Sequence, residues 1–185
     1  MAKLFKETED WQFNARIPNL ANRRINYVEG YVIAIEAIEK QIKENRTEID
    51  FLIYPYLFLH RHLLELSMKE IIMLGNKILN KQEDKYKGGH DLATLWNESQ
   101  KILKEVWQDQ YEKPAEKTYN KLKEFHNLDL KSDGFRYPID IDGNINLEQI
   151  SSRINLNNFK EEFEDLFYCT TGLIDGLYVV LDNNF

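Results

Sequence analysis

One uninterrupted helical pattern, over residues 50–79, limits the folds open to this chain more than any other feature. On a helical wheel the central part of this pattern has two apolar faces. One face holds Leu57, Leu64, Met68, Ile71 and Ile72, and the other holds Leu59, Leu63, Leu66, Met73 and Leu74. A helix that is apolar on two sides is normally buried at the centre of a fold. The pattern therefore predicts a central helix surrounded by other elements.

A narrow polar stripe runs between these two faces and consists of Arg61, Glu65 and Lys69, with His62 beside it. Arg61 and Lys69 each stand four residues from Glu65, a spacing that favours ion pairs along a helix. A buried charge needs a partner, because stripping it of water unpaired costs several kcal/mol. The stripe is interpreted either as a structural seam, in which Glu65 also pairs with Arg136, or as a pocket or dimer surface that binds an anion.

The remaining patterns predict an all-α protein with four to five helices in a bundle. Residues 1–18 are expected to be irregular, and a small β-hairpin or irregular insertion is expected near residues 133–148, around Asp142-Gly143. With 185 residues the chain is long enough for one domain, taken as residues 1–185. The other helical patterns cover about residues 19–45, 90–108, 113–128 and 158–181.

Composition and charge narrow the classes of function. The net charge of −7 argues against avid non-specific binding of nucleic acid. Cys169 is the single cysteine, which is typical of a reducing compartment. The longest apolar run, residues 49–59, is far shorter than the roughly 20 residues of a membrane-spanning helix. The first residues turn polar too early for a secretory signal. We therefore expect a cytoplasmic protein that does not contact a membrane.

Three segments together resemble the HEPN superfamily (higher eukaryotes and prokaryotes nucleotide-binding domain). They are "HRHLLELSMKEIIMLG" at residues 60–75, "GGHDLATLWNE" at 88–98 and "GFRYPID" at 134–140. The first is similar to the family's Glu-x-x-x-Lys motif through Glu65 and Lys69. The second is similar to its His-Asp-Leu-x-x-Leu helix start, and the third to its Arg-Tyr-Pro segment.

The resemblance implies a four-helix core, a homodimer and a role in bacterial toxin–antitoxin or phage-defence systems. Many such domains are metal-independent ribonucleases with an arginine four to six residues before a histidine. This sequence departs from that pattern, since no arginine precedes a histidine at that spacing. A ribonuclease would need another set of catalytic residues, such as Arg61, His62 and Arg136.

The candidate ligand-binding residues combine the stripe with the two other motifs. His90 and Asp91 either bind an anion at a helix start or cap that helix. His60 points away from the stripe and is interpreted as a core histidine. His60 and His62 do not share a helix face, so no metal site is expected there, and no cofactor is predicted. The candidates are Arg61, His62, Glu65, Lys69, His90, Asp91, Arg136 and Tyr137.

Three hypotheses of function follow. The first is a binding or regulatory module that recognises a nucleotide, an RNA or a protein partner, such as an antitoxin or an effector, without efficient catalysis. The second is a divergent, metal-independent ribonuclease toxin. The third is a structural helical subunit of a larger complex.

Overall fold

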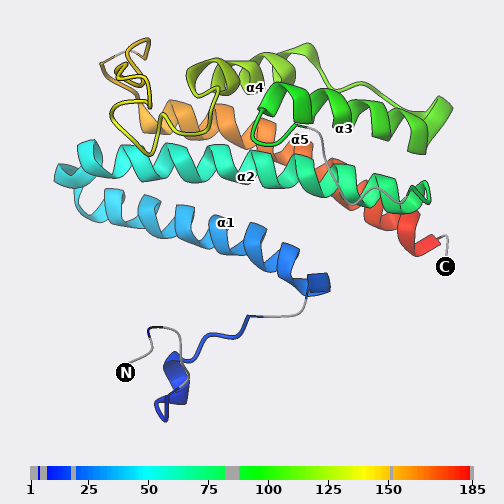
Figure 1. Ribbon diagram of the computed structural model, residues 1–185, viewed down its shortest axis with the longest axis horizontal. Helices are drawn as coiled ribbons and strands as arrows, with labels where there is room; N and C mark the ends of the chain where they lie inside the picture. Colours follow the sequence, from blue (N-terminus) through cyan, green and yellow to red (C-terminus); the bar gives the residue numbers. More distant parts are fainter. Residues whose placement is uncertain (1–3, 5–7, 18–19, 82–87, 151, 184–185) are drawn as a thin grey trace.

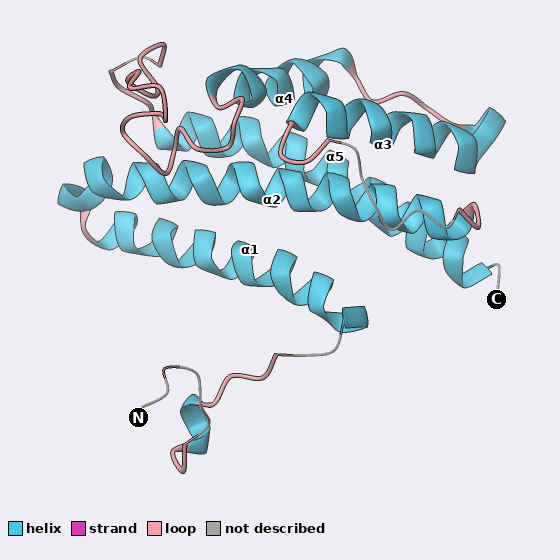
Figure 2. Ribbon diagram, viewed as in Figure 1, coloured by secondary structure: helices cyan, strands magenta, loops and turns pink. Residues whose placement is uncertain are grey.

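The computed structural model describes residues 4, 8–17, 20–81, 88–150 and 152–183, and five α-helices make up most of this part of the chain (Figures 1 and 2). The remaining residues of the predicted irregular N-terminal segment lie outside this description. The helices are α1 (Leu20–Glu44), α2 (Ile49–Ile78), α3 (Leu92–Trp107), α4 (Glu116–Leu128) and α5 (Leu156–Asn183).

The helices form an all-α bundle, as the sequence predicts, and α2 is its central element. Helix α2 packs against α1, α3 and α5, while α4 packs against α3 and α5 (Figure 1). Fourteen residues of α2 are buried, against six of α3, so the expectation of a central helix is confirmed. Leu66, which the wheel placed on an apolar face, is only partly buried.

Helices α2 and α3 approach each other closely at Gly75. At Gly75 of α2 an added Cβ atom would lie 2.1 Å from Cγ2 of Ile102, which is itself buried. Real Cβ atoms do not approach other atoms so closely, so a glycine is required for these two helices to pack at this distance. Helix α3 then begins beside α2, with Asp91 as its N-cap residue.

The predicted helix boundaries agree with the structure to within a few residues, and α4 differs most at its start. The sequence predicted a helix over about residues 113–128, which contains Pro114 near its start, but α4 begins at Glu116 with Ala115 as its N-cap residue. Residues 8–17 contain one short turn of 3-10 helix at Trp11–Phe13 and are otherwise irregular. Trp11 and Phe13 are exposed there, apart from the bundle (Figure 1).

The segment between α4 and α5 is irregular rather than a β-hairpin. Its only pairing among the described residues is an isolated antiparallel bridge between Ile139 and Ile145. Gly143 makes the intervening turn with φ 86°, and the carboxylate of Asp140 accepts hydrogen bonds from the N–H groups of Asp142 and Asn144. The turn therefore lies at Asp142-Gly143, the position that was predicted from the sequence. Strands do not extend from it because Ile139 and Ile145 are exposed and have no core to pack against.

Among the described residues, none of the helices has the length and apolar character needed to cross a lipid bilayer.

His60 of α2 is buried in the aromatic core and should make stability depend on pH. Its Nδ1 lies 2.8 Å from the carbonyl oxygen of Tyr56, and its ring contacts Tyr56, Phe159 and Phe163 edge-on. Burial lowers the pKa of His60 to about 4 from 6.5, since the charged form is poorly solvated there. The interpretation of His60 as a core histidine is confirmed.

Because the pKa of His60 is lower in the fold, the unfolded chain binds more protons between about pH 6.5 and 4. Stability is therefore fully present above pH 6.5 and falls as the pH drops through this window. We expect the free energy of unfolding to decrease by about 2 kcal/mol between pH 7 and pH 5. Urea titrations at both pH values measure this change, and a His60→Leu variant should show a smaller one. An equal decrease in both proteins would assign the effect to other groups.

Candidate functional site

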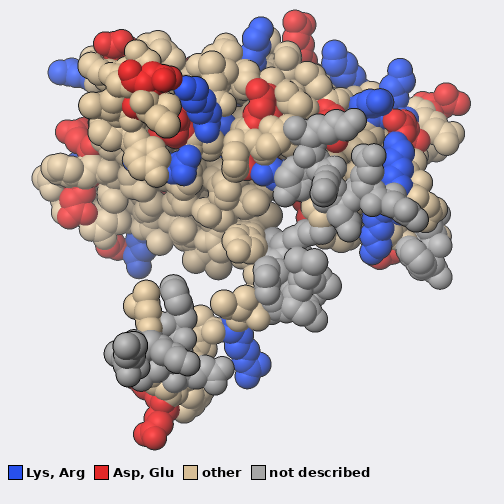
Figure 3. Space-filling model, viewed as in Figure 1, with Lys and Arg blue, Asp and Glu red and all other residues tan. Residues whose placement is uncertain are grey.

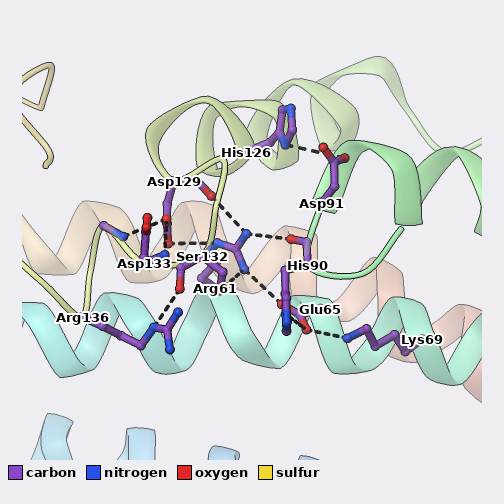
Figure 4. A network of polar contacts seen from close by, with 11 residues as sticks. Arg61, Glu65, Lys69, His90, Asp91, His126, Asp129, Ser132, Asp133 and Arg136 are labelled. Carbon is purple, nitrogen blue, oxygen red and sulfur yellow. Dashed lines mark hydrogen bonds and ion pairs between the residues drawn. The ribbon is translucent and has the colours of Figure 1, made fainter. Parts of the chain in front are cut away.

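Arg61 is fully buried at the centre of a polar network that joins three segments of the chain (Figure 4). Its Nη1 donates to Oε2 of Glu65 at 3.1 Å and to Oγ of Ser132 at 2.9 Å. Its Nη2 donates to the carbonyl oxygens of His90, at 2.8 Å, and Asp129, at 3.1 Å. Every terminal nitrogen of the guanidinium group is thus occupied by protein oxygen atoms.

Asp129, just after α4, supplies the second buried carboxylate beside Arg61. Its Oδ2 lies 3.2 Å from Nε of Arg61, an ion pair without hydrogen-bond alignment. Its Oδ1 accepts hydrogen bonds from the N–H groups of Asp133 and Gly134. Ser132, which accepts from Arg61, has φ 62°, in the left-handed region that serine seldom adopts. The network therefore also holds an unfavourable backbone turn in place.

Glu65 links the network to the surface. Its Oε1 accepts a hydrogen bond from Nζ of Lys69 at 2.6 Å and lies 2.9 Å from Nδ1 of His90. Burial raises the pKa of Glu65, but the hydrogen bonds and charges of Lys69 and His90 outweigh it, so the pKa lies below its usual value. Glu65 is therefore ionised at neutral pH. The predicted pairs of Glu65 with Arg61 and Lys69 are confirmed.

The predicted pairing of Glu65 with Arg136 is wrong, because Arg136 is turned toward other groups. Its Nε donates to the carbonyl oxygen of Ser132 at 2.8 Å, and its guanidinium carbon lies 5.8 Å from the ring centre of Phe58 and 5.3 Å from that of Tyr137. His90 takes the place expected for Arg136 beside Glu65. The terminal nitrogens of Arg136 have no hydrogen-bond partner among the residues that the structure describes.

His90 and Asp91 have separate roles. His90 exposes 66% of its side chain, and since a carboxylate only accepts hydrogen bonds, its Nδ1 carries the proton that faces Glu65. The opposite nitrogen, Nε2, is then available to a ligand. Asp91 caps α3 by accepting from the N–H of Thr94 at 2.6 Å, and it lies 3.9 Å from Nδ1 of His126. The capping interpretation of Asp91 is therefore confirmed.

His62 lies on the exposed side of α2 and is held between two aromatic rings. Its ring meets Tyr31 edge-on at 4.7 Å and stacks on Phe58 at 5.8 Å between centres. Burial lowers the pKa of His62; Glu65 opposes this change, and the neighbouring cations reinforce it. His62 is therefore mainly neutral at pH 7.

We call a group of partly or fully exposed side chains the α2 stripe and define it as Phe58, His62, Lys69, His90 and Arg136. It differs from the polar stripe of the sequence, because it leaves out the buried Arg61 and Glu65. Phe58, His62 and Lys69 share one side of α2 by their helical spacing, and the two loop residues flank them. Arg136 covers Phe58 at one end, and His90 reaches Glu65 near the other. The stripe combines cationic and aromatic groups, whereas Arg61 and Glu65 lie beneath it.

A groove of about 890 Å³ opens beside Arg136, between the first turns of α2 and the irregular segment before α5. Figure 3 shows a largely uncharged area over α1 and the N-terminal part of α2, bordered by both basic and acidic groups. Tyr137 belongs to this groove and not to the network around Arg61.

Within the described part of the chain, no three His, Cys, Asp or Glu side chains are placed to hold a metal ion.

Sequence reasoning missed Asp129, Ser132 and the groove. Asp129 and Ser132 stand 68 and 71 residues from Arg61 and belong to no periodic pattern. One available signal was the charge imbalance of the predicted polar stripe, where the two cations Arg61 and Lys69 flank the single carboxylate of Glu65.

Comparisons of this chain with protein-family models, with curated proteins and with solved structures gave no match.

Proposed function

We propose that this protein is a HEPN-like binding module that recognises a nucleotide or a short single-stranded RNA and does not cleave it efficiently. The observation that carries the proposal is the α2 stripe, which presents Arg136 and His90 on either side of half-buried aromatic rings. Proteins that bind single-stranded nucleic acid commonly combine cationic groups for the phosphates with aromatic groups for the bases. The resemblance to the HEPN superfamily supports a homodimer and a role in bacterial defence or toxin–antitoxin systems.

The geometry around Arg61 favours binding over catalysis. A ribonuclease that used Arg61, His62 and Arg136 would need Arg61 to reach a phosphate. Arg61 is fully buried, and its terminal nitrogens all donate to protein oxygen atoms. His62 is enclosed by Tyr31 and Phe58, so its access to a ribose hydroxyl is restricted. The stripe can still contact phosphates through Arg136 and, when both ring nitrogens carry a proton, through Nε2 of His90; both side chains are exposed.

The direct test is binding of a fluorescein-labelled 12-nucleotide oligouridine, followed by fluorescence anisotropy at low salt. We expect saturable binding that weakens about tenfold in an Arg136→Gln, His90→Gln double variant, because each substitution removes a cationic or donor contact to phosphate. Arg46→Gln, at an exposed arginine outside the stripe, is the matched control and should bind as the wild type does. Light scattering on the same samples should give twice the chain mass of 22.1 kDa.

Gel analysis of the same mixtures separates binding from cleavage. The RNA should remain intact after incubation without metal ions. Cutting by the wild type that His62→Ala abolishes would instead support the ribonuclease hypothesis. Absence of any anisotropy change at 100-fold excess of protein over RNA, or equal binding by the double variant, would contradict a nucleic-acid site on the stripe.

A further inference from the structure

The groove beside Arg136 has the size of a small-molecule site and is partly open to solvent. Its volume of about 890 Å³ falls in the range of ligand pockets in proteins, roughly 300–1,000 Å³. One wall is the first turns of α2, and the other is formed by side chains from residues 134–150 and 152–156, the last of which begins α5. This segment lies beside the N-terminal end of α2 in Figure 1. The groove thus lies between a rigid helix and a loop held by the Arg61 network.

The interior of the groove is apolar. Leu57 and Phe135 are both 4% exposed and belong to the core, while Ile53, Leu147 and Ile154 are partly buried and pack against it. These side chains come from α2 and from the irregular segment. A ligand body that removes such surface from water gains free energy through the hydrophobic effect. The part of a ligand that enters the groove should therefore be aliphatic or aromatic.

The groove is lined by two arginines and one acidic residue, although the whole chain carries a net charge of −7. Arg136 and Arg153 are exposed on the rim, and Asp50 is the acidic residue among the lining side chains. The guanidinium plane of Arg136 is held by two kinds of contact. Its Nε donates a hydrogen bond to the carbonyl oxygen of Ser132, and the group lies against the rings of Phe58 and Tyr137. A guanidinium group fixed in this way suits a carboxylate or sulfonate, which it can bind through two parallel hydrogen bonds.

We infer that the groove between α2 and residues 134–150 and 152–156 is a binding site for a small organic anion with an apolar body and one carboxylate-like head group. The apolar body occupies the groove against Leu57 and Phe135, and the head group pairs with Arg136 at the rim. The walls offer few polar groups for the several phosphates of an RNA, so this site is distinct from the rest of the α2 stripe and shares only Arg136 with it. The groove can bind its ligand even if the stripe binds no nucleic acid, although the two sites would compete for Arg136.

The test uses two fluorescent probes that share an aromatic body and differ in charge. They are 8-anilinonaphthalene-1-sulfonate and the neutral N-phenyl-1-naphthylamine. We expect the folded wild-type protein to bind one molecule of the sulfonate at micromolar concentration and the neutral amine about tenfold more weakly. Decanoate should displace the sulfonate at concentrations at which decanol does not. Arg136→Gln should weaken the sulfonate about tenfold and leave the neutral amine unchanged.

A second pair of variants locates the site. Ile53→Glu places a carboxylate inside the groove and should abolish binding of the sulfonate, while Ile33→Glu, at an exposed position of α1, should bind as the wild type does. If Ile53→Glu fails to fold, the comparison of decanoate with decanol on the wild-type protein still shows whether the site prefers an anionic head group. No saturable binding, equal affinity for both probes in the wild type, or wild-type binding by a folded Ile53→Glu would overturn the proposal.

Discussion

Arg61→Ala is expected to lower the free energy of unfolding by about 3–5 kcal/mol, because it leaves Glu65 and Asp129 buried without their shared cation. Both carboxylates are inaccessible to water, and Arg61 also satisfies two carbonyl oxygens and the hydroxyl of Ser132. Urea unfolding followed by circular dichroism at pH 7 measures the change. Arg46→Ala is the matched control, since Arg46 is exposed, and it should change stability by less than about 0.5 kcal/mol.

The pH dependence of the stability lost in Arg61→Ala distinguishes two causes of that loss, an unpaired buried charge and an empty cavity. Without Arg61, protonation of Glu65 relieves part of the buried negative charge, so the variant should lose less stability relative to the wild type at pH 5 than at pH 8. The titration of His60 is common to both proteins and cancels in the difference. A loss that is equal at the two pH values would mean that packing, and not charge, is what Arg61 contributes.

Leu64→Ala is expected to lower the free energy of unfolding by about 2–5 kcal/mol, as truncation of a fully buried leucine does. Leu64 is 0% exposed and lies on the face of α2 that includes Met68 and Ile72, which are also fully buried. Thermal and urea unfolding of the variant measure the loss. Leu130→Ala, at a leucine that is 58% exposed, is the control and should be nearly neutral. A similar loss in both variants would show that α2 is not the core of the bundle.

The helices were predictable because each leaves a local pattern in the sequence. The spacing of apolar residues along 57–74 depends only on the period of the helix, so it identified α2 as the central element before any contact was known. Boundaries depend on capping geometry, which explains why α4 begins two residues after Pro114. The hairpin around Asp142-Gly143 followed a sound turn signal, but strand formation also needs an apolar surface to cover the strands, and none is present there.

The candidate site was only partly predictable, because its contacts cross between segments. The pairs of Glu65 with Arg61 and Lys69 are four residues apart and follow from helix geometry alone. The contact of His90 with Glu65 depends on how closely α3 approaches α2, which the fit of Ile102 against Gly75 sets. Asp129 and Ser132 reach Arg61 through an irregular turn with a positive φ at Ser132, and no periodic pattern encodes such a turn.

The position of Arg61 also bears on the order in which backbone amides exchange with solvent. The N–H groups of Asp133 and Gly134 donate to Asp129, whose carboxylate is paired with Arg61 in the middle of α2. An irregular surface segment ordinarily opens on its own and exchanges early. Here opening requires a buried ion pair to separate, so these two amides should exchange as slowly as those of α2. The loop after α4 would then unfold as one cooperative unit with the central helix.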